Sequence, residues 1–239
     1  MVASSLAAGT APAAFAVSAD SSHALPRSPE TWNDSAPPSG QLFTRGDAGF
    51  AAAAVAGVAL GTRLDRWADE EVPENNGPFA VHVSHAVEHL GNAAYILPAF
   101  LILRAADALE HRSDRAASLV RIAEGTVAAG AAAGIVKVAV GRARPFQTPD
   151  DQDVMRPFSG YSSFPSGHTA LAFGLAAAID RETSAKWVPW VVYPLAGLVG
   201  WSRVRDGKHW SSDVVAGAAL GSWTARKAVT LARHRRHLR

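Results

Sequence analysis

The chain has 239 residues, a formal net charge of +2 and 48% hydrophobic residues, which suits a single domain with a sizeable core. It contains no cysteine, which excludes disulfides, thiolate nucleophiles and cysteine-ligated metals. Much of the basic excess lies between Arg226 and Arg239. Such an end can bind anionic lipid headgroups or nucleic acid, but it also fits a solvated helix end.

The first residues of the chain are small and apolar, with A-x-A-like sites between Ala13 and Ala19. A secretory signal begins with a positive region, whereas no Lys or Arg precedes Arg27. We interpret residues 1–20 as a truncated or degraded export signal, with a disordered tail as the alternative. The following residues are rich in Ser, Pro, Asp and Asn and are typical of a linker. We therefore predict an N-terminal segment and linker over 1–40 and one helical domain over 41–239.

The rest of the chain carries patterns typical of helices. We expect helices over 46–70, 79–90, 92–110, 114–140, 167–181, 186–202 and 211–234. The sequence shows neither the period-two alternation of a sheet nor a repeat of 20–50 residues. It thus predicts an all-α fold, a bundle of about six core helices with a site at helix ends on one face.

Six charge-free apolar runs raise the question of a membrane. They are 11 to 16 residues long and comprise Ala48–Thr62, Gly91–Leu103, Gly125–Val136, Thr169–Ile179, Trp187–Ser202 and Val214–Ala225. A spanning helix needs about 20 apolar residues, so these lengths favour a soluble or peripheral bundle. Tryptophans at the edges of the runs are instead typical of a membrane interface. The sequence leaves both possibilities open.

The first of three polar motifs is K-V-A-V-G-R-A-R-P at 137–145, where a predicted helix ends. Lys137 and Arg144 are seven residues apart, about two helical turns, so both can project to one side. Arg142 lies close by. Basic residues at a helix C-terminus also interact favourably with the helix dipole, which is a purely structural alternative.

The second motif is F-P-S-G-H-T at 164–169, directly before an apolar helix. Backbone N–H groups at a helix start bind anions, and Ser166 can cap the helix and donate a hydrogen bond. His168 lies in the first turn, where an imidazole could give a proton to a leaving oxygen. The alternative is a simple N-cap with a partly exposed histidine.

The third motif is S-R-V-R-D-G-K-H-W-S-S-D at 202–213. His209 and Asp213 are four residues apart, one helical turn, so their side chains can touch. A carboxylate bonded to one imidazole nitrogen fixes the tautomer and raises the basicity of the other nitrogen. His209 is therefore a candidate nucleophile or base, although an ordinary surface pair has the same spacing.

The three motifs share one location, because each lies at an expected helix end. Antiparallel connectivity lets them converge on one face of a bundle. Together they supply cations, a helix-start anion site and two histidines, one of them next to a carboxylate. Positively charged groups stabilise the charge on a transferring phosphoryl group, so the combination indicates phosphoryl chemistry.

These motifs resemble those of the type 2 phosphatidic acid phosphatase (PAP2) superfamily. Its members include lipid phosphate phosphatases, undecaprenyl-diphosphate phosphatases, bacterial class A acid phosphatases and vanadium haloperoxidases. The family pattern is K-x6-R-P, then P-S-G-H, then S-R-x5-H-x3-D. Every position is matched in order and spacing, by Lys137, Arg144, Pro145, Pro165, Ser166, Gly167, His168, Ser202, Arg203, His209 and Asp213.

The resemblance implies a role for each matched polar residue. His209 would attack phosphorus and form a phosphohistidine, with Asp213 orienting it. His168 would protonate the leaving alkoxide and then activate water. The phosphoryl oxygens would be held by Lys137, Arg144, Ser166, Gly167 and Arg203. The resemblance implies no metal and no other cofactor.

We therefore expect a metal-independent phosphatase acting on a lipid-linked phosphate or diphosphate, of the phosphatidate or isoprenyl diphosphate type. We expect membrane contact and no nucleic-acid partner, and we leave the oligomeric state open. The alternatives are a soluble periplasmic non-specific acid phosphatase, a vanadate-dependent haloperoxidase and a non-catalytic envelope scaffold that binds lipid. If the N-terminal segment is an export signal, the active site faces the extracytoplasmic side of the cell envelope.

Three further histidines, His82, His85 and His89, share one helix face with i, i+3, i+7 spacing. Histidines on one face can form a metal site. The spacing fits a polar bundle face or the rim of a substrate entrance better.

Overall fold

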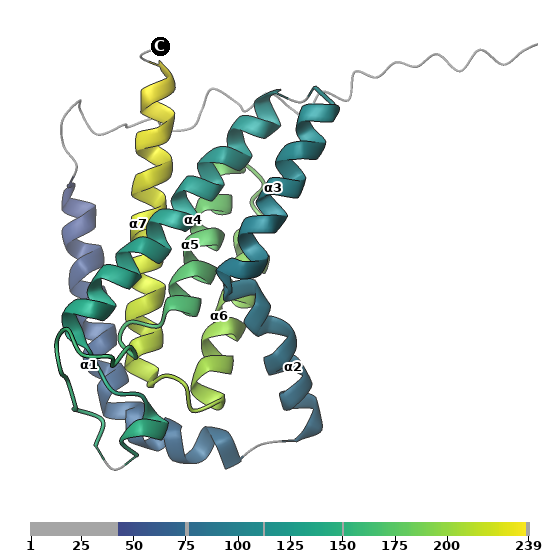
Figure 1. Ribbon diagram of the computed structural model, residues 1–239. Helices are drawn as coiled ribbons and strands as arrows, with labels where there is room; N and C mark the ends of the chain where they lie inside the picture. The colour runs from purple at the N-terminus through teal and green to yellow at the C-terminus, as the bar shows by residue number, and fades with distance from the viewer. Residues whose placement is uncertain (1–42, 75–76, 112, 150, 238–239) are drawn as a thin grey trace, which may run out of the picture. The chain divides into compact units, whose positions relative to one another are not determined.

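The computed structural model describes residues 43–74, 77–111, 113–149 and 151–237, and every regular element in these ranges is helical (Figure 1). The α-helices are α1 (Arg45–Glu74), α2 (Pro78–Glu88), α3 (Ala93–Leu109), α4 (Ser113–Val140), α5 (Gly167–Glu182), α6 (Pro189–Arg205) and α7 (Ser211–His237). Two short 3-10 helices, η1 (His89–Gly91) and η2 (Pro145–Gln147), follow α2 and α4. The all-α prediction is confirmed, and the expected ranges differ from these helices by only a few residues. The predicted N-terminal segment lies outside the described residues.

Small residues bring the central helices close together. Helix α5 packs against α4, α6 and α7. Its buried residues are mostly alanine, with Ala170, Ala172, Gly174, Ala176, Ala177 and Ala178 among them. A Cβ atom on Gly217 of α7 would lie 2.5 Å from the backbone oxygen of Ser166, so only glycine fits there. The start of α5 therefore lies directly against the first turns of α7.

One end of the bundle collects the three sequence motifs. Helix α4 ends there at Val140, and α5 and α7 begin there at Gly167 and Ser211. The connection 141–166 and the short turn between α6 and α7 lie at this same end, at the bottom of Figure 1. The predicted placement of the site at helix ends on one face follows from this connectivity.

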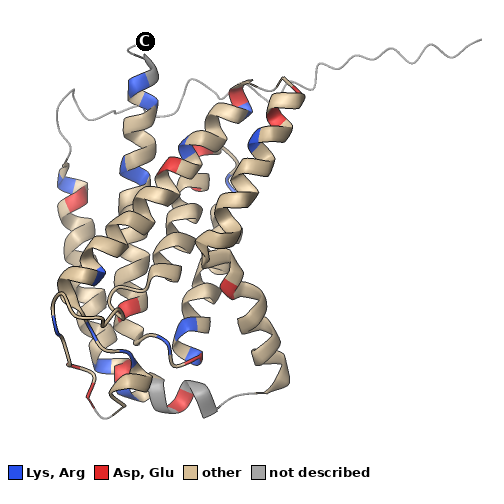
Figure 2. Ribbon diagram, in the orientation of Figure 1, with Lys and Arg blue, Asp and Glu red and all other residues tan. Residues whose placement is uncertain are grey.

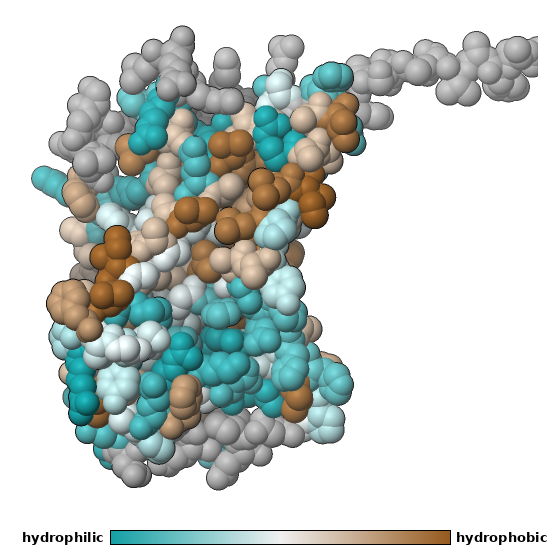
Figure 3. Space-filling model, in the orientation of Figure 1, coloured by the Kyte–Doolittle hydropathy of each residue, from teal (hydrophilic) through white to brown (hydrophobic). Residues whose placement is uncertain are grey.

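The charged residues gather toward the two ends of the helices, and the part between is largely uncharged (Figure 2). Large apolar side chains are exposed along α3, α4 and α6, among them Leu97, Leu101, Ile102, Val127, Ile135, Val138, Trp190, Val191 and Leu195. Figure 3 shows a brown area over α3 and α4. We call this exposed surface the apolar belt. Soluble monomers rarely expose apolar patches of this extent.

Helix α4 is long and apolar enough to cross a membrane. The α2–η1 segment and α3, bent by 59° at their junction, pass the same test as one broken span. Core helices of soluble proteins can pass it too, but only 28% of the apolar window of α4 is buried. The charge-free runs in the sequence understate these lengths, because charged residues near helix ends shorten a run without shortening the helix.

Candidate active site

Backbone contacts tie the three motifs together. The N–H of Ser166 donates to the backbone oxygen of Asp213 at 2.9 Å, which joins the start of α5 to the first turn of α7. The indole N–H of Trp210 donates to the backbone oxygen of Ala143 at 3.0 Å, which joins the third motif to the first. Residues 47 and 67 positions apart in the sequence are thus brought together at one end of the bundle.

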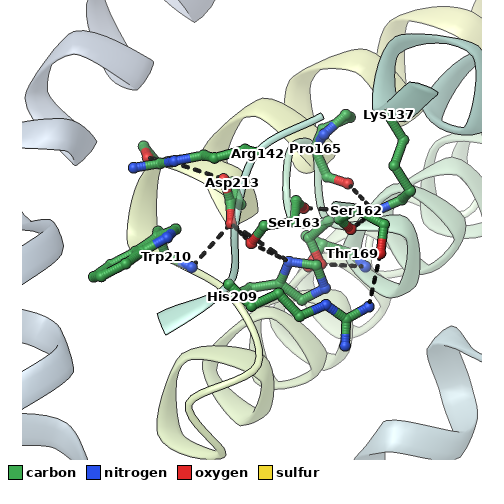
Figure 4. A network of polar contacts seen from close by, with 12 residues as sticks. Lys137, Arg142, Ser162, Ser163, Pro165, Thr169, His209, Trp210 and Asp213 are labelled. Carbon is green, nitrogen blue, oxygen red and sulfur yellow. Dashed lines mark hydrogen bonds and ion pairs between the residues drawn. The ribbon is translucent and has the colours of Figure 1, made fainter. Parts of the chain in front are cut away.

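The central pair of the site is His209 and Asp213, both buried (Figure 4). His209 Nδ1 lies 3.5 Å from Asp213 Oδ2. The same carboxylate oxygen accepts hydrogen bonds from the Ser163 hydroxyl and, at 3.0 Å, from the Trp210 backbone N–H. Because Nδ1 faces the carboxylate, the second ring nitrogen of His209 points away from Asp213 and is left for chemistry, as Figure 4 shows.

The protonation states follow from burial and neighbouring charge. Burial lowers the pKa of His209 below its ordinary 6.5, and the hydrogen bond that the ring donates to Asp213 offsets this only in part. Burial lowers the pKa of His168 to about 4, with the charges of Arg203 and His209 adding to the effect. Burial raises the pKa of Asp213, but the His209 hydrogen bond and the Arg142 charge outweigh it and keep that pKa below its ordinary value. At pH 7 both imidazoles are therefore neutral and the carboxyl group is ionised.

Lys137 and Arg144 lie beside the histidine, and the charges of both act on it. Lys137 Nζ donates to the backbone oxygens of Ser162 at 2.5 Å and Pro165 at 2.9 Å (Figure 4). Arg144 contacts the Ser162 hydroxyl at 3.4 Å. The carbonyl oxygens fix the ammonium position, and both cations are only half-buried. The pair can therefore reach an anion at the site.

The start of α5 has the predicted cap. The Ser166 hydroxyl oxygen accepts hydrogen bonds from Thr169, at 2.9 Å from its hydroxyl and 3.5 Å from its backbone N–H. Gly167 is the first helical residue and His168 the second. The backbone of His168 packs against η1, where a Cβ on Gly91 would lie 2.6 Å from the His168 oxygen. Ser166 is fully buried, whereas Gly167 and His168 are half-buried at the helix start.

Arg203 is placed differently from the other expected anion binders. It is almost fully buried and donates to Glu88 at 2.7 Å and to Asp206 at 3.3 Å. Its Nε donates to the Ser202 hydroxyl at 3.2 Å. Two carboxylates thus fix the guanidinium beside His168, whose pKa it lowers.

Several residues of the site carried no clear signal in the sequence. Ser163 contacts Asp213, Glu88 pairs with Arg203, and Asp65 of α1 accepts hydrogen bonds from Arg142. The sequence marks Arg142 only as a neighbour of the first motif. It donates to both Asp65 and Asp213, which a reading of neighbouring residues alone does not reveal.

The histidines of α2 and η1 lie apart from these contacts. His82, His85 and His89 are exposed, His82 Nδ1 lies 2.6 Å from the backbone oxygen of Pro78, and His89 packs on Tyr95. Within the described ranges no three His, Asp or Glu side chains form a group that could hold a metal ion.

Comparison with known proteins identifies relatives among phosphatases. Lipid A 1-phosphatase of Rhizobium johnstonii is 38% identical over 101 residues, covering 41% of each chain. Undecaprenyl-diphosphatase of Sulfolobus acidocaldarius is 39% identical over 90 residues, covering 37% of this chain and 43% of its own length. A probable diacylglycerol pyrophosphate phosphatase of Schizosaccharomyces pombe is 32% identical over 178 residues, covering 60% and 63%. The chain thus spans less than two thirds of the length of these relatives.

Two solved structures share the fold. A transmembrane PAP2 type phosphatidylglycerolphosphate phosphatase from Bacillus subtilis aligns with a TM-score of 0.57 at 20% identity, over 80% of this chain and 96% of its own. LpxE of Aquifex aeolicus aligns with a TM-score of 0.50 at 19% identity, over 69% and 94%. The model of the PAP2 superfamily matches residues 118–236, the half of the chain that holds all three motifs. The chain therefore belongs to the PAP2 superfamily.

Proposed function

We propose that this protein is a phosphatase that hydrolyses lipid-linked phosphate or diphosphate through a phosphohistidine at His209. The observation that carries the proposal is the buried His209–Asp213 pair, in which the carboxylate engages Nδ1 and the charges of Lys137 and Arg144 act on the ring. A neutral imidazole held in one tautomer is a competent nucleophile at neutral pH. The relatives are all named as phosphatases of lipid or isoprenyl phosphates.

The reaction divides into two displacements at phosphorus. His209 Nε2 attacks phosphorus, the bond to the leaving oxygen breaks, and His168 gives that oxygen a proton. A water molecule then attacks the phosphohistidine, His168 takes the water proton, and the P–N bond breaks to release inorganic phosphate. The pKa of about 4 for His168 describes the protein alone; a bound phosphate anion raises it, because an opposite charge favours the imidazolium.

The charge on the phosphoryl oxygens requires compensation, which the cations of the site supply. Lys137 and Arg144 are half-buried next to His209, and Arg203 lies beside His168. The start of α5 adds backbone N–H groups and the helix dipole. Preorganised charges of this kind stabilise a transition state without the reorganisation that water would need.

An apolar groove favours a lipid substrate over a small soluble phosphoester. A cavity of about 790 Å³ runs between α1, α4 and α7 and is lined by apolar residues such as Ala51, Ala54, Val58, Val136, Ala216 and Leu220. It reaches Phe164 and Pro165, directly before Ser166 of the site. Along α1 it extends from Asp47 to Ala59, about 18 Å by helical rise. One leaflet of a bilayer core is about 15 Å thick, so one lipid tail fits this length.

The apolar belt supports insertion of the bundle in a membrane. Basic residues lie at both ends of the bundle, such as Lys137, Arg144 and Arg203 at the site and Arg115, Lys186 and Arg235 at the opposite end. The positive-inside rule therefore does not orient the bundle. We propose that the active site faces the extracytoplasmic side, as an export signal over residues 1–20 would require.

Phosphate release by the full chain tests the proposal. The substrates are short-chain and long-chain phosphatidate, farnesyl diphosphate and p-nitrophenyl phosphate, each with EDTA present, and the His209→Ala variant is the control. We expect preference for the lipid substrates, activity in EDTA and loss of turnover in the variant. Unchanged turnover in His209→Ala would contradict the phosphohistidine. Equal or better turnover of p-nitrophenyl phosphate would favour a non-specific acid phosphatase instead.

A further inference from the structure

A buried arginine links the catalytic carboxylate to a helix that carries no motif. Arg142 is 2% exposed and its guanidinium donates in two directions. One terminal nitrogen donates to Asp213 Oδ1 at 2.8 Å and to the Ser212 hydroxyl at 2.6 Å. The other donates to Asp65 Oδ2 at 2.9 Å and to the backbone oxygen of Gln152 at 2.8 Å. The arginine thus bridges α1 and α7.

Asp65 holds the same turn of α7 from the other side. Its Oδ1 accepts the backbone N–H of Ser212 at 2.8 Å, and its Oδ2 accepts the Ser212 hydroxyl at 2.6 Å. One turn earlier on α1, Gly61 permits this approach, because a Cβ there would lie 2.9 Å from Ser212 Cα. The residue next to the catalytic carboxylate is therefore fixed through its backbone and its side chain.

The bridge determines how the Asp213 carboxylate is rotated. Arg142 occupies Oδ1, so Oδ2 is the oxygen that faces His209 Nδ1. Figure 4 shows Arg142 and His209 on opposite sides of the carboxylate. A carboxylate held at both oxygens cannot turn, and the imidazole it contacts keeps one orientation.

Burying this set of charges has a cost that packing alone does not justify. Asp65, Arg142 and Asp213 have side-chain exposures of 0%, 2% and 0%. Replacing buried ion pairs by apolar residues of similar volume is often neutral or stabilising, so such a network contributes little to stability by itself. Its position behind the catalytic pair suggests that its contribution is orientation.

We propose that Asp65 and Arg142 are positioning residues that hold the Asp213 carboxylate, and through it the His209 ring, in the orientation for attack on phosphorus. This inference rests on the proposed function. Neither residue touches the substrate. Replacing either residue should therefore lower kcat and leave KM nearly constant.

The first test replaces Asp65 and Arg142 each by a residue of similar size. Asp65→Asn keeps the volume but has one acceptor oxygen in place of two, so it cannot accept all three hydrogen bonds that Asp65 takes from the Ser212 backbone N–H, the Ser212 hydroxyl and Arg142. Arg142→Lys keeps the charge but loses the planar fork that reaches two carboxylates. We expect each to lower kcat about 10- to 100-fold, as removal of a group that orients a catalytic ligand typically does. We expect less than a twofold change in KM.

A matched control separates positioning from general stability. Glu182 is a buried carboxylate held by Arg121 at 2.7 Å and Arg233 at 2.9 Å, at the opposite end of the bundle. Glu182→Gln removes a comparable network that joins helices but does not approach the site. We expect it to lower the unfolding midpoint and leave kcat of the folded protein unchanged. A kcat loss in Asp65→Asn no larger than in Glu182→Gln would overturn the inference.

The pH profile provides a readout that a purely structural role would not change. Arg142→Met removes a cation beside the catalytic pair, which favours the protonated forms of Asp213 and His209. Because His209 sets the acid limb of kcat/KM, we expect that limb to move to higher pH. Arg142→Lys retains the charge and should keep the limb in place despite its lower kcat. An unmoved limb in a folded Arg142→Met protein would contradict the inference, as would an increase in KM at constant kcat in Asp65→Asn. If Arg142→Met does not fold, Asp65→Asn and Arg142→Lys decide.

Failure of the proposed function is distinguishable from failure of this inference. Active wild-type protein with inactive His209→Ala establishes the reaction. If Asp65→Asn and Arg142→Lys then have wild-type kcat, the positioning role is wrong and the phosphatase remains. If His209→Ala retains wild-type turnover, the proposed mechanism is wrong and the positioning role is wrong with it.

Discussion

The backbone N–H of Ser166 donates a hydrogen bond to the backbone oxygen of Asp213, across 47 residues of sequence. This contact holds the start of α5, the proposed anion site, in a fixed relation to the carboxylate that contacts His209. The close approach of α5 and α7 at Gly217 lies directly beside it. The geometry of the candidate site therefore depends on the packing of two helices as much as on the motif residues themselves.

Replacing His168 should slow the cleavage of each substrate to an extent that depends on how much its leaving group needs a proton. Phosphatidate needs a proton on its leaving alkoxide, whereas p-nitrophenolate leaves without one. We expect His168→Gln to lower kcat for phosphatidate by about 10²- to 10⁴-fold, the usual contribution of a general acid. With p-nitrophenyl phosphate the first step should survive, and a phosphohistidine should accumulate because its hydrolysis lacks a base. Mass spectrometry of the quenched protein measures this adduct. Because the slowed hydrolysis step is common to both substrates, kcat/KM is the quantity to compare, and equal losses of kcat/KM for both would contradict the role of His168 as the acid.

The pH dependence should follow the neutral form of His209. Its lowered pKa keeps the imidazole neutral above pH 6.5, so we expect the acid limb of kcat/KM below that value. Asp213→Asn removes an interaction that raises this pKa, so the limb should move further down in pH. We also expect kcat to fall about 10²- to 10⁴-fold because the tautomer is no longer fixed.

Comparison of the two pH profiles with one substrate isolates the protein groups, because the ionisation of the substrate is common to both. A limb that moves up in Asp213→Asn would be inconsistent with a neutral His209 nucleophile. The acid limb is expected to move to lower pH in Asp213→Asn and to higher pH in Arg142→Met. The two variants therefore serve as controls for one another.

How well the sequence predicts a contact depends on how far apart its two residues lie in the chain. The site pair His209 and Asp213 is one helical turn apart, and its contact follows from local geometry. Helix boundaries were predictable for the same reason, since caps and glycines act within a few residues. Asp65 shows the limit. It lies 147 residues from Ser212, and a lone acid near a helix end does not indicate its partner.

The role of Arg203 shows a second limit. Its motif position predicts contact with phosphoryl oxygens, but the structure surrounds it with Glu88 and Asp206. The carboxylate of Glu88 comes from α2, and its approach depends on the bend between α2 and α3. A sequence pattern lists the groups that bind an anion but not the groups that compete with it.

Glycine substitutions should separate close packing from helix propensity. Gly217→Ala places a Cβ 2.5 Å from the Ser166 oxygen, so α5 and α7 must move apart. We expect a loss of about 1–3 kcal/mol in the free energy of unfolding, together with lower activity. Gly197 of α6 has nothing within 4 Å, so Gly197→Ala should be neutral or stabilise by up to about 1 kcal/mol. Denaturant unfolding measures both, and equal effects would argue against tight α5–α7 packing.

The absence of cysteine makes the proposed orientation directly measurable. Ser159 lies in the connection at the active-site end and Ser113 at the start of α4, at the other end, and both are exposed. We expect Ser159→Cys to react with a membrane-impermeant thiol reagent in intact cells and Ser113→Cys to react only after lysis. The reverse labelling pattern would place the active site in the cytoplasm. Labelling of both in intact cells would contradict membrane insertion.

Filling the groove should change the preference for tail length. Ala54 of α1 lines the groove, and its neighbour Ala53 is exposed and lies outside the lining. We expect Ala54→Phe to lower the ratio of kcat/KM for long-chain over short-chain phosphatidate about tenfold or more, because a lost apolar contact costs about 1–3 kcal/mol. Ala53→Phe makes the same change at an exposed position outside the groove lining and should leave the ratio as it is. If the two variants give the same ratio, the lipid tail does not occupy this groove, and the tail must contact the apolar belt elsewhere.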